Sequence, residues 1–451
     1  MLQCATPRNR AVVPVPQPAP SALLPRWEVG FDAGRLTSDG GLPWVAAAED
    51  ALGVCAAFAA AIPDWRRGPV RHPLATLVRQ RVFQIACGYA DQDDADHLRT
   101  DPLLKAVCGR RPATGADLAS QPTMSRLENA VDGRSCARLA DVLFGLYVRE
   151  RGRAGPPPRL LLDIDSTDDP AHGAQEGTAY HGHFRRHMYH PLLVFDGDTD
   201  HLVVAALRAG NAHAAQGVVG LVGALVPALR ARWPGVPIEL RLDGGAAVPE
   251  LYACCERLGV GYTIGLPPNA RLRAPAAPLV QAAETDRAAT GAAKVRLVGD
   301  TPYQAGSWPH PRRVVVKAEA TAKGTNTRFV VTTRPDPPRA LYDWYVDRGE
   351  VEGWIKDLKN ACFADRLSDH RFWANQFRLL LHAAAYWLLD TLRRWLAAAG
   401  AARLQLDTLR LRLLKIGAWV VEAADRVRLR LASSHPAEAL WRLLVAHRGP
   451  P

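Results

Sequence analysis

The sequence predicts an α/β protein in which a mixed sheet is flanked by helices and preceded by a helical region. Two observations support this fold class. Apolar residues recur with helical spacing from about 38 to 150, and after the Gly- and Pro-rich linker 152–158 the pattern changes to short apolar strands that alternate with helices. Hydrophobic residues form 48% of the 451-residue chain, which is enough for a sizeable core.

The N-terminal part of the chain divides into two regions. Residues 1–25 are rich in proline and predict a disordered arm. Residues 26–152 predict a helical DNA-binding region, in which the segment 121–129 (QPTMSRLEN) presents a polar face that includes Arg126. This segment fits a helix that reads DNA through Arg126, and it fits equally well the start of an ordinary exposed helix.

The order of elements in residues 153–268 predicts the type of sheet. Strand patterns and helix patterns follow one another as strands 159–164, 191–195 and 202–207, helix 214–233, strand 238–242, helix 248–258 and strand 262–266. Three antiparallel strands followed by parallel strands with helical crossovers match a ribonuclease H-like sheet. These residues therefore predict the first part of a ribonuclease H-like core.

The core pattern is interrupted once before the chain ends. Strand-like pieces continue from about 270 to 334, and they predict a β-rich insertion over 269–326. The core resumes over 327–371 with a helix from about 340 to 360. Residues 372–451 return to helix, with two short strands around 418–431, and are expected to form a helical dimerisation region.

Three acidic residues fall at functional positions of the predicted core. Asp165 closes the first strand, Asp243 closes the fourth, and Glu352 lies on the last core helix. Ligands of α/β sheets bind at the carboxyl ends of strands, where a carboxylate is otherwise a poor strand residue. Two Mg²⁺ ions roughly 3.5–4 Å apart neutralise the attacking and leaving oxygens of a phosphodiester, and Mg²⁺ prefers oxygen ligands. The three carboxylates therefore predict a two-Mg²⁺ site, in which Mn²⁺ is expected to substitute.

The helix that carries Glu352 also has a polar stripe. Tyr345, Arg348, Glu352 and Lys359 follow the spacing Y-x2-R-x3-E-x6-K. At a helical period they share one stripe about 60° wide, from which Arg348 and Lys359 could hold phosphates on either side of Glu352. A solvated face with an Arg348–Glu352 pair explains the same spacing.

This spacing resembles the Y-R-E-K signature of DDE transposases from bacterial insertion sequences, residue for residue. Asp165-Ser-Thr167 also resembles the D-x-T around the first catalytic aspartate of that family, and Arg241-Leu-Asp243-Gly resembles the R-x-D-[SG] around the second. The resemblance runs from about Thr37 to the end of the chain. The sequence departs from it at Gly244-Gly245-Ala246, where relatives often have a serine and an aromatic residue.

The resemblance implies an enzyme that binds transposon ends, cleaves DNA with Mg²⁺ and joins the strands to target DNA in cut-and-paste transposition. It implies that Asp165, Asp243 and Glu352 are the catalytic metal ligands, and that Tyr345, Arg348 and Lys359 contact DNA. It further implies double-stranded inverted-repeat ends as partners, a homodimer on paired ends, and a bacterial protein that is cytoplasmic and nucleoid-associated.

Two residue assignments stay open within the resemblance. Asp163 shares a strand face with Asp165 and is either a supporting carboxylate or the first ligand itself, although Thr167 favours Asp165. Transposases of this type carry a β-rich insertion between the second aspartate and the glutamate. In that insertion Trp308 is a candidate to stack on a flipped-out base, or alternatively a tryptophan of the small-domain core.

Charge and motif content agree with a DNA partner. Lys plus Arg outnumber Asp plus Glu by 56 to 45, giving a net charge of +11, which suits a polyanion. The sequence shows no Walker loop, no secretory signal and no apolar run longer than 13 residues, so neither a nucleotide cofactor nor a membrane is expected. Two alternatives remain: a catalytically inactive relative that still binds ends, and a ribonuclease H-like DNA nuclease.

Overall fold

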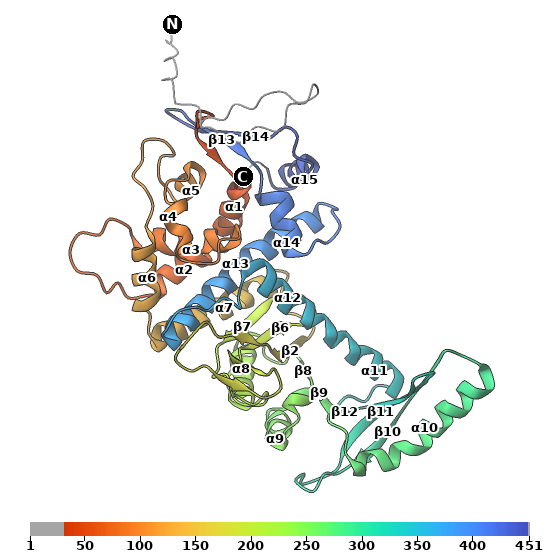
Figure 1. Ribbon diagram of the computed structural model, residues 1–451. Helices are drawn as coiled ribbons and strands as arrows, with labels where there is room; N and C mark the ends of the chain where they lie inside the picture. The colour runs from red at the N-terminus through yellow and green to blue at the C-terminus, as the bar shows by residue number, and fades with distance from the viewer. Residues whose placement is uncertain (1–30, 450–451) are drawn as a thin grey trace, which may run out of the picture.

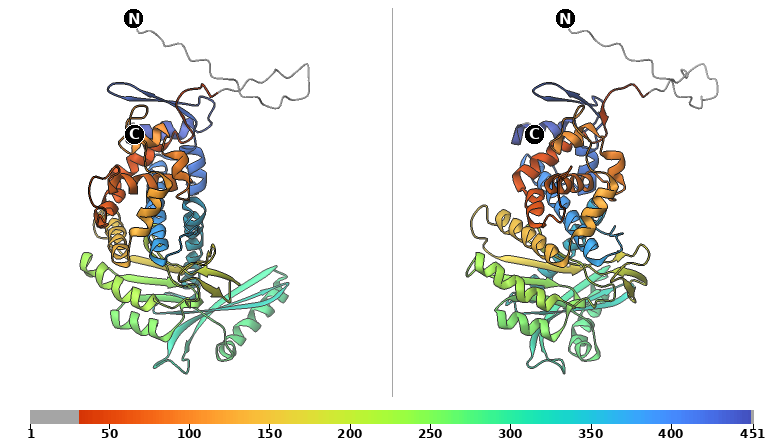
Figure 2. Two further views of the ribbon diagram at one scale, coloured as in Figure 1. Left: turned by 60° about the vertical axis from the view of Figure 1, so that its left-hand side comes forward. Right: turned by 90° about the vertical axis from the view of Figure 1, so that its left-hand side faces the viewer.

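The computed structural model describes residues 31–449 and shows a mixed α/β fold (Figure 1). The predicted disordered arm, 1–25, lies outside the described residues. A layer of N-terminal helices stands on one side of the molecule, and a mixed sheet with its own flanking helices stands on the other (Figures 1 and 2). The α/β class predicted from the sequence is confirmed.

The N-terminal region is helical, as the sequence predicts. Its helices start where side chains can satisfy free backbone N–H groups. Asp101 Oδ1 accepts from Leu103 N at 2.9 Å, and Asp132 Oδ1 accepts from Ser135 N at 2.8 Å. The region contains β1 (Leu36–Thr37), α1 (Leu42–Leu52), α2 (Val54–Ala61), α3 (Leu74–Ala86), α4 (Asp94–Leu98), α5 (Pro102–Val107), α6 (Gln121–Ala130) and α7 (Gly133–Arg151).

Within the described residues, the main sheet has eight strands in the order β10-β11-β12-β9-β8-β2-β6-β7. The three central strands β9, β8 and β2 are parallel, and the strands on both sides of them pair antiparallel. The core strands lie within two residues of their predicted positions: β2 (Leu160–Ser166), β6 (Leu192–Asp196), β7 (Leu202–Ala206), β8 (Ile238–Leu242) and β9 (Gly261–Leu266).

Helices cover both faces of this sheet. Tyr252 of α9 (Pro249–Leu258) stacks on Tyr262, with ring centroids 5.4 Å apart, and α9 packs against α8 (Val218–Arg232). Trp354 of α12 (Glu350–Cys362) packs on Phe195 of β6 at 5.6 Å. The register aligns Tyr262 with Asp196, the neighbour of Phe195, so Tyr262 and Phe195 point to opposite faces. The helices α8 and α9 therefore lie on the face opposite α12.

The long helix α13 (Phe372–Ala398) joins the two halves of the molecule. It is almost completely buried, and it packs on α1, α3, α6 and α7 on one side and on α12 and β7 on the other (Figure 1). The sequence predicted this helix over 377–399. The C-terminal elements that follow are α14 (Leu406–Leu409), a π-helical turn (Arg410–Leu414), β13 (Ala418–Glu422), β14 (Val427–Leu431) and α15 (Glu438–Arg448).

The prediction of strand-like structure from residue 270 onward is wrong for the first third of that segment. Residues 270–290 form α10 (Ala270–Thr290), whose N-terminus is capped by Asn269 Oδ1 at 2.9 Å from Leu272 N. Strands follow only later, as β10 (Lys294–Tyr303), β11 (Arg312–Thr321) and β12 (Gly324–Thr332). These strands extend the main sheet through the pairing of β12 with β9, and β12 runs across the boundary placed at 326.

Two further features differ from the sequence prediction. The single helix expected from 340 to 360 is divided into α11 (Pro338–Val346) and α12 by the 3-10 turn Asp347–Gly349. A small separate sheet, unpredicted, contains β3 (Asp169–Pro170), β4 (Ala179–His181) and β5 (Arg186–Tyr189). Among residues 31–449, no single helix is long and apolar enough to span a membrane, although α1 and α2, bent by 62° at their junction, pass that test as a pair.

Candidate active site

Asp165 and Asp243 lie side by side at the carboxyl ends of β2 and β8, two neighbouring strands in the middle of the main sheet. The last paired residues of β2 and β8 are Ile164 and Leu242, so each aspartate sits directly beyond this pair. Each carboxylate also accepts a local backbone hydrogen bond, Asp165 from Ser166 N at 2.8 Å and Asp243 from Gly245 N at 3.0 Å. These bonds fix the two carboxylates where the strands open into loops.

One rung deeper in the sheet, Asp163 and Arg241 form a buried ion pair. Two guanidinium nitrogens of Arg241 each lie 2.7 Å from a carboxylate oxygen of Asp163. A third Arg241 nitrogen donates to the backbone oxygen of Trp344 at 2.9 Å and so ties α11 to the sheet. Because Asp163 is committed to this pair, the geometry favours Asp165 over Asp163 as the first metal ligand.

Arg348 lies between the carboxylates. Its Nη1 is 3.0 Å from Asp165 Oδ2, and its Nη2 is 3.4 Å from Glu352 Oε1. The Arg348–Glu352 pair expected for a solvated face does form, but Arg348 also bridges to a strand residue 183 positions earlier in the chain. The stripe therefore faces the edge of the sheet.

The charges at this edge are unevenly balanced. Burial and, next, the neighbouring Asp243 charge raise the pKa of Asp165 to about 6, although Arg348 opposes this shift. Burial alone would lower the pKa of Arg348, but the surrounding Asp165, Tyr345, Asp243 and Glu352 raise it overall. Asp165 and Asp243 thus repel each other in a partly buried site, and the Arg348 guanidinium offsets this repulsion only in part.

The other two members of the stripe anchor the loops around the aspartates. The hydroxyl of Tyr345 donates to Leu242 O at 3.1 Å, next to Asp243. Lys359 Nζ lies 2.9 Å from both the backbone oxygen and Oδ1 of Asp168, three residues after Asp165. Both side chains are placed at the predicted site and hold protein groups there. Their contact with DNA stays a prediction.

The donor set fits a divalent cation. Asp165, Asp243 and Glu352 offer only carboxylate oxygens, the ligands that Mg²⁺ prefers. A cation would also relieve the repulsion between the two aspartates. Within residues 31–449, no three Asp, Glu, His or Cys side chains already stand close enough together to hold a metal ion. Glu352 does not stand close to the two aspartates because its side chain points outward, is 70% exposed and pairs with Arg348.

Arg126 and Trp308 lie in different environments. Arg126 is exposed on α6, whose buried face includes Met124 and Leu127, so its position is compatible with both sequence interpretations. Trp308 is only 6% exposed, and its ring packs edge-on against Tyr252 at 5.3 Å, with the Arg312 guanidinium 5.1 Å from the ring centroid. The base-stacking prediction for Trp308 is therefore wrong for this structure, because its ring is enclosed in the core.

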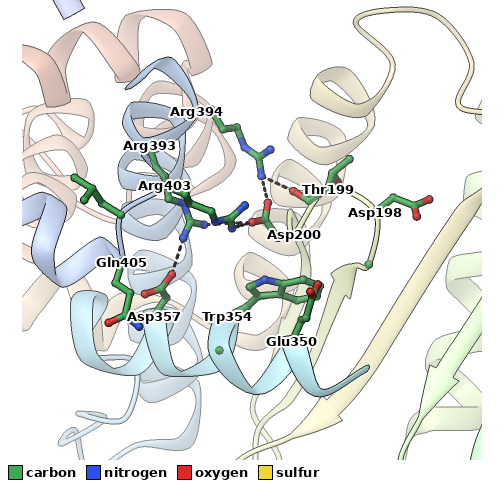
Figure 3. A pocket seen from close by; sticks show the side chains of 13 residues that line it. Asp198, Thr199, Asp200, Glu350, Trp354, Asp357, Arg393, Arg394, Arg403 and Gln405 are labelled. Atoms are coloured by element: carbon green, nitrogen blue, oxygen red, sulfur yellow. Dashed lines mark hydrogen bonds and ion pairs between the residues drawn. The ribbon is translucent and has the colours of Figure 1, made fainter. Parts of the chain in front are cut away.

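The back of α12 shows a contact set that the sequence analysis missed. Asp357 accepts from Arg393 Nη1 of α13 at 2.6 Å, and Trp354 and Asp357 face a cavity of about 530 Å³ there (Figure 3). Three arginines in this cavity, Arg393, Arg394 and Arg403, all contact Asp200. No local pattern links residues 357 and 393, so the packing of α12 on α13 is what reveals that this network holds α12.

An α/β sheet with paired carboxylates at the carboxyl ends of neighbouring parallel strands is the arrangement expected of an α/β enzyme site. The chain belongs to the family described as transposase DDE domain group 1, whose model matches residues 23–447. The DDE transposase class predicted from the motifs is thereby confirmed. The insertion-sequence origin and the Y-R-E-K subtype stay predictions.

Other comparisons place the chain at a greater distance from known proteins. A comparison with curated proteins finds no match. Among solved structures, the chain is similar to a piggyBac transposase in a synaptic complex with hairpin DNA, with a TM-score of 0.44 and 12% sequence identity. That similarity covers 84% of this chain and 80% of the other.

Proposed function

We propose that this chain is an active transposase that cleaves and joins DNA with two Mg²⁺ ions held by Asp165, Asp243 and Glu352. The observation that carries the proposal is the pair of aspartates at adjacent strand ends, with Arg348 of the 3-10 turn bonded to Asp165 and to Glu352 of α12. The strand order around β2, three antiparallel strands and then two parallel ones with helical crossovers, supports a ribonuclease H-like core.

Each residue of the site has a separable task in this proposal. Asp165 and Asp243 are the rigid ligands, since backbone hydrogen bonds already orient both carboxylates. Glu352 is the adjustable third ligand, because its exposed side chain is free to change rotamer. The helix that carries it is fixed on its other face by the pairing of Asp357 with Arg393. When bound, Mg²⁺ supplies charge neutralisation at the phosphodiester and an activated oxygen nucleophile. Release of Arg348 from Asp165 leaves its guanidinium free to hold a DNA phosphate.

The proposed partners follow from family membership and charge. We expect double-stranded inverted-repeat ends and target DNA as partners, because a net charge of +11 favours a polyanion. The helical region 26–152 is proposed to bind DNA and the region 372–451 to support a homodimer on paired ends. We further propose an insertion-sequence protein of a bacterial cytoplasm and nucleoid, with Mn²⁺ able to replace Mg²⁺.

The proposal is tested with a labelled duplex that carries the element's own end. Purified protein with Mg²⁺ is expected to produce a discrete nick at the element boundary on a denaturing gel, and Asp165→Ala is expected to abolish it. Glu352→Gln should also abolish cleavage while end binding persists. Glu350→Gln is the matched control, because Glu350 is exposed on the same helix but faces the cavity behind it. Retained cleavage by Glu352→Gln would remove Glu352 from the ligand set.

Two other outcomes would identify the alternatives. Tight, end-specific binding without cleavage would indicate an inactive relative. In that case Gly244-Gly245-Ala246 would be the first segment to examine, because no polar side chain follows Asp243 there. Cleavage at many positions without a joined product would indicate a nuclease.

A further inference from the structure

A second charged cavity lies in the N-terminal helical layer, outside the carboxylate site. It encloses about 320 Å³ between the loop that joins α2 to α3 and the start of α6. Its charged lining is entirely basic and consists of Arg66, Arg67, Arg71, Arg99 and the imidazole of His72. Among residues 31–449, no carboxylate lines this cavity, although it borders solvent on a protein with many surface ion pairs.

Two of these arginines have no protein partner. In residues 31–449, neither Arg67 nor Arg71 donates a side-chain hydrogen bond or forms an ion pair, and both are exposed. Arg66 differs, because Asp64 accepts two hydrogen bonds from it at 2.8 Å. Arg99 only approaches Asp117, at 3.9 Å. The loop thus keeps one arginine as a structural brace and leaves two cations uncompensated.

The inner wall of the cavity contains an unsatisfied polar side chain. His72 is only 8% exposed, and within the described part of the chain its Nδ1 has no hydrogen-bond partner. Burial, and then the charges of Arg71, Arg110 and Arg66, lower the pKa of His72. This nitrogen is shielded from solvent, so His72 forms part of the cavity wall. The arginine charges around the wall indicate that a ligand of this cavity is an anion.

The start of α6 adds neutral donors to the same cavity. Ser120 and Thr123 line it, and Ser120 is the N-cap residue of α6 but makes no side-chain capping bond. Hydroxyl groups at the positive end of a helix dipole are suited to an oxyanion. Guanidinium groups, hydroxyl donors and an imidazole are the kinds of side chain that bind a phosphate group in proteins.

The cavity behind α12 provides a contrast. It also contains three arginines, but all three contact Asp200, and Arg393 also contacts Asp357 (Figure 3). Arg393 pairs in addition with Asp390. Its arginines are therefore neutralised within the protein. Of these two cavities, as residues 31–449 line them, the N-terminal one is the one with arginines that lack an ion-pair partner.

We propose that the cavity formed by Arg67, Arg71, Arg99 and His72 binds a backbone phosphate of duplex DNA away from the cleavage site. The proposal rests on the proposed function only in taking DNA as the partner. The helix α6 connects the cavity to the segment between α12 and α13. Its far end is bonded through Asn129 Nδ2 to Asp369 Oδ2 at 2.8 Å, seven residues after α12 ends. Ten helical residues span about 15 Å, so α6 acts as a rigid spacer between the phosphate contact and that segment.

The test measures the affinity of the full chain for labelled duplex DNA by fluorescence anisotropy, in EDTA and over a series of salt concentrations. The variant Arg67→Ser/Arg71→Ser is compared with Arg232→Ser/Arg428→Ser. The control pair is also exposed and without an ion-pair partner in the described residues, and it removes the same net charge. Loss of this one phosphate contact lowers the slope of log K against log salt by about 0.9 and weakens binding roughly 8-fold at 0.1 M salt. The control variant should leave the salt slope unchanged and should alter the affinity at 0.1 M salt by no more than a small factor.

The outcomes separate this inference from the proposed function. Equal weakening by both double variants, or none by either, overturns the phosphate cavity, whatever the cleavage assay shows. Selective weakening by Arg67→Ser/Arg71→Ser supports it even if no cleavage is found, because the assay contains no metal. Calorimetric titration with inorganic phosphate is the second arm. Tight binding of inorganic phosphate that the double variant loses, with unchanged DNA affinity, would assign the cavity to a free phosphate and overturn the proposal.

Discussion

Asp165 carries the strongest electrostatic conflict in the site, and its environment makes a prediction about stability. Its pKa is raised to about 6, above the usual value of 3.8, by burial and by Asp243. The folded state therefore binds a proton more tightly than the unfolded state, and the ionised carboxylate destabilises the fold above about pH 6. Removing the charge with Asp165→Asn should stabilise the metal-free protein by roughly 2 kcal/mol at pH 8.

The pH dependence identifies the cause of this effect. Below about pH 4, Asp165 is protonated in both the folded and the unfolded state, so the advantage of Asp165→Asn should vanish there. The measurement is thermal unfolding of both proteins in EDTA between pH 4 and pH 8. A stability difference that does not change over this range would show that packing, rather than charge, distinguishes the two side chains.

Gly265 sets how closely Tyr345 approaches the loop after β8. A Cβ at this position would lie 2.7 Å from the Tyr345 hydroxyl and 2.9 Å from the backbone nitrogen of Gly244. Because Gly244 follows Asp243, Gly265→Ala should displace the second aspartate and slow cleavage at least tenfold, with DNA affinity retained. Gly261→Ala on the same strand is the control, since its Cβ would press only on the flexible Glu239 side chain, 3.2 Å away. Equal cleavage rates for the two variants would contradict the role of this contact.

Individual residues were predictable where chemistry and spacing are local. The stripe from Tyr345 to Lys359 was found from helical spacing alone. Tyr345, Arg348 and Lys359 contact residues at the ends of the strands or just after them, whereas Glu352 pairs only with Arg348 among the described residues. Trp308 was misassigned because an aromatic residue in a presumed insertion gives no sign of its burial. That burial depends on Tyr252 and Tyr303, which lie in other elements.

Among the helices, α12 depends on contacts behind it as much as on those at the site. Arg393 of α13 is 4% exposed and pairs with Asp357, Asp390 and Asp200. Removing one member of such a buried network leaves charges without partners, so Arg393→Ala should cost about 3 kcal/mol in urea unfolding. It should also slow cleavage by loosening α12.

Arg394→Ala is the comparison for this element. Arg394 also contacts Asp200 and Asp390, but 36% of its side chain is exposed, so solvent and its neighbours compensate its loss. We expect a cost below about 1 kcal/mol for that variant. Comparable losses for Arg393→Ala and Arg394→Ala would show that the network stabilises the turn after β6 rather than the catalytic helix.

The element prediction failed where local signals conflicted. Residues 270–290 contain Pro275 and Pro278, which disfavour a helix interior, yet an Asn269 cap and abundant alanine support α10. The division between α11 and α12 left little signal, because Trp344 and Val351 keep a helical spacing of seven residues across Asp347–Gly349 and only Gly349 disfavours a helix there. Core strands were predictable because each is a short apolar run bounded by turn residues.

Pairings between distant parts of the chain could not be read from the sequence. Leu36 of β1 pairs with Trp419 of β13, which joins the beginning of the described chain to its C-terminal region. The pairing of β12 with β9 turns the expected insertion into an extension of the main sheet. Such contacts follow from which surfaces remain to be covered once the core has formed, and local periodicity does not encode them.

Divalent-cation binding connects the site to the stability of the whole molecule. An ion that binds only the folded chain stabilises it by RT ln(1 + c/Kd) at free ion concentration c, which is about 1.4 kcal/mol at tenfold excess over its Kd. Because Asp165 and Asp243 repel each other without a cation, Mg²⁺ should raise Tm by about 2 °C over EDTA, and Mn²⁺ should do the same. The double variant Asp165→Asn/Asp243→Asn should have a higher Tm in EDTA and show no response to either ion. Glu350→Gln, which alters an exposed carboxylate on the far face of α12, should respond like the unmodified chain. A Mg²⁺ response that survives in the double variant would place the dominant cation site elsewhere and remove the thermodynamic support for metal binding between β2 and β8.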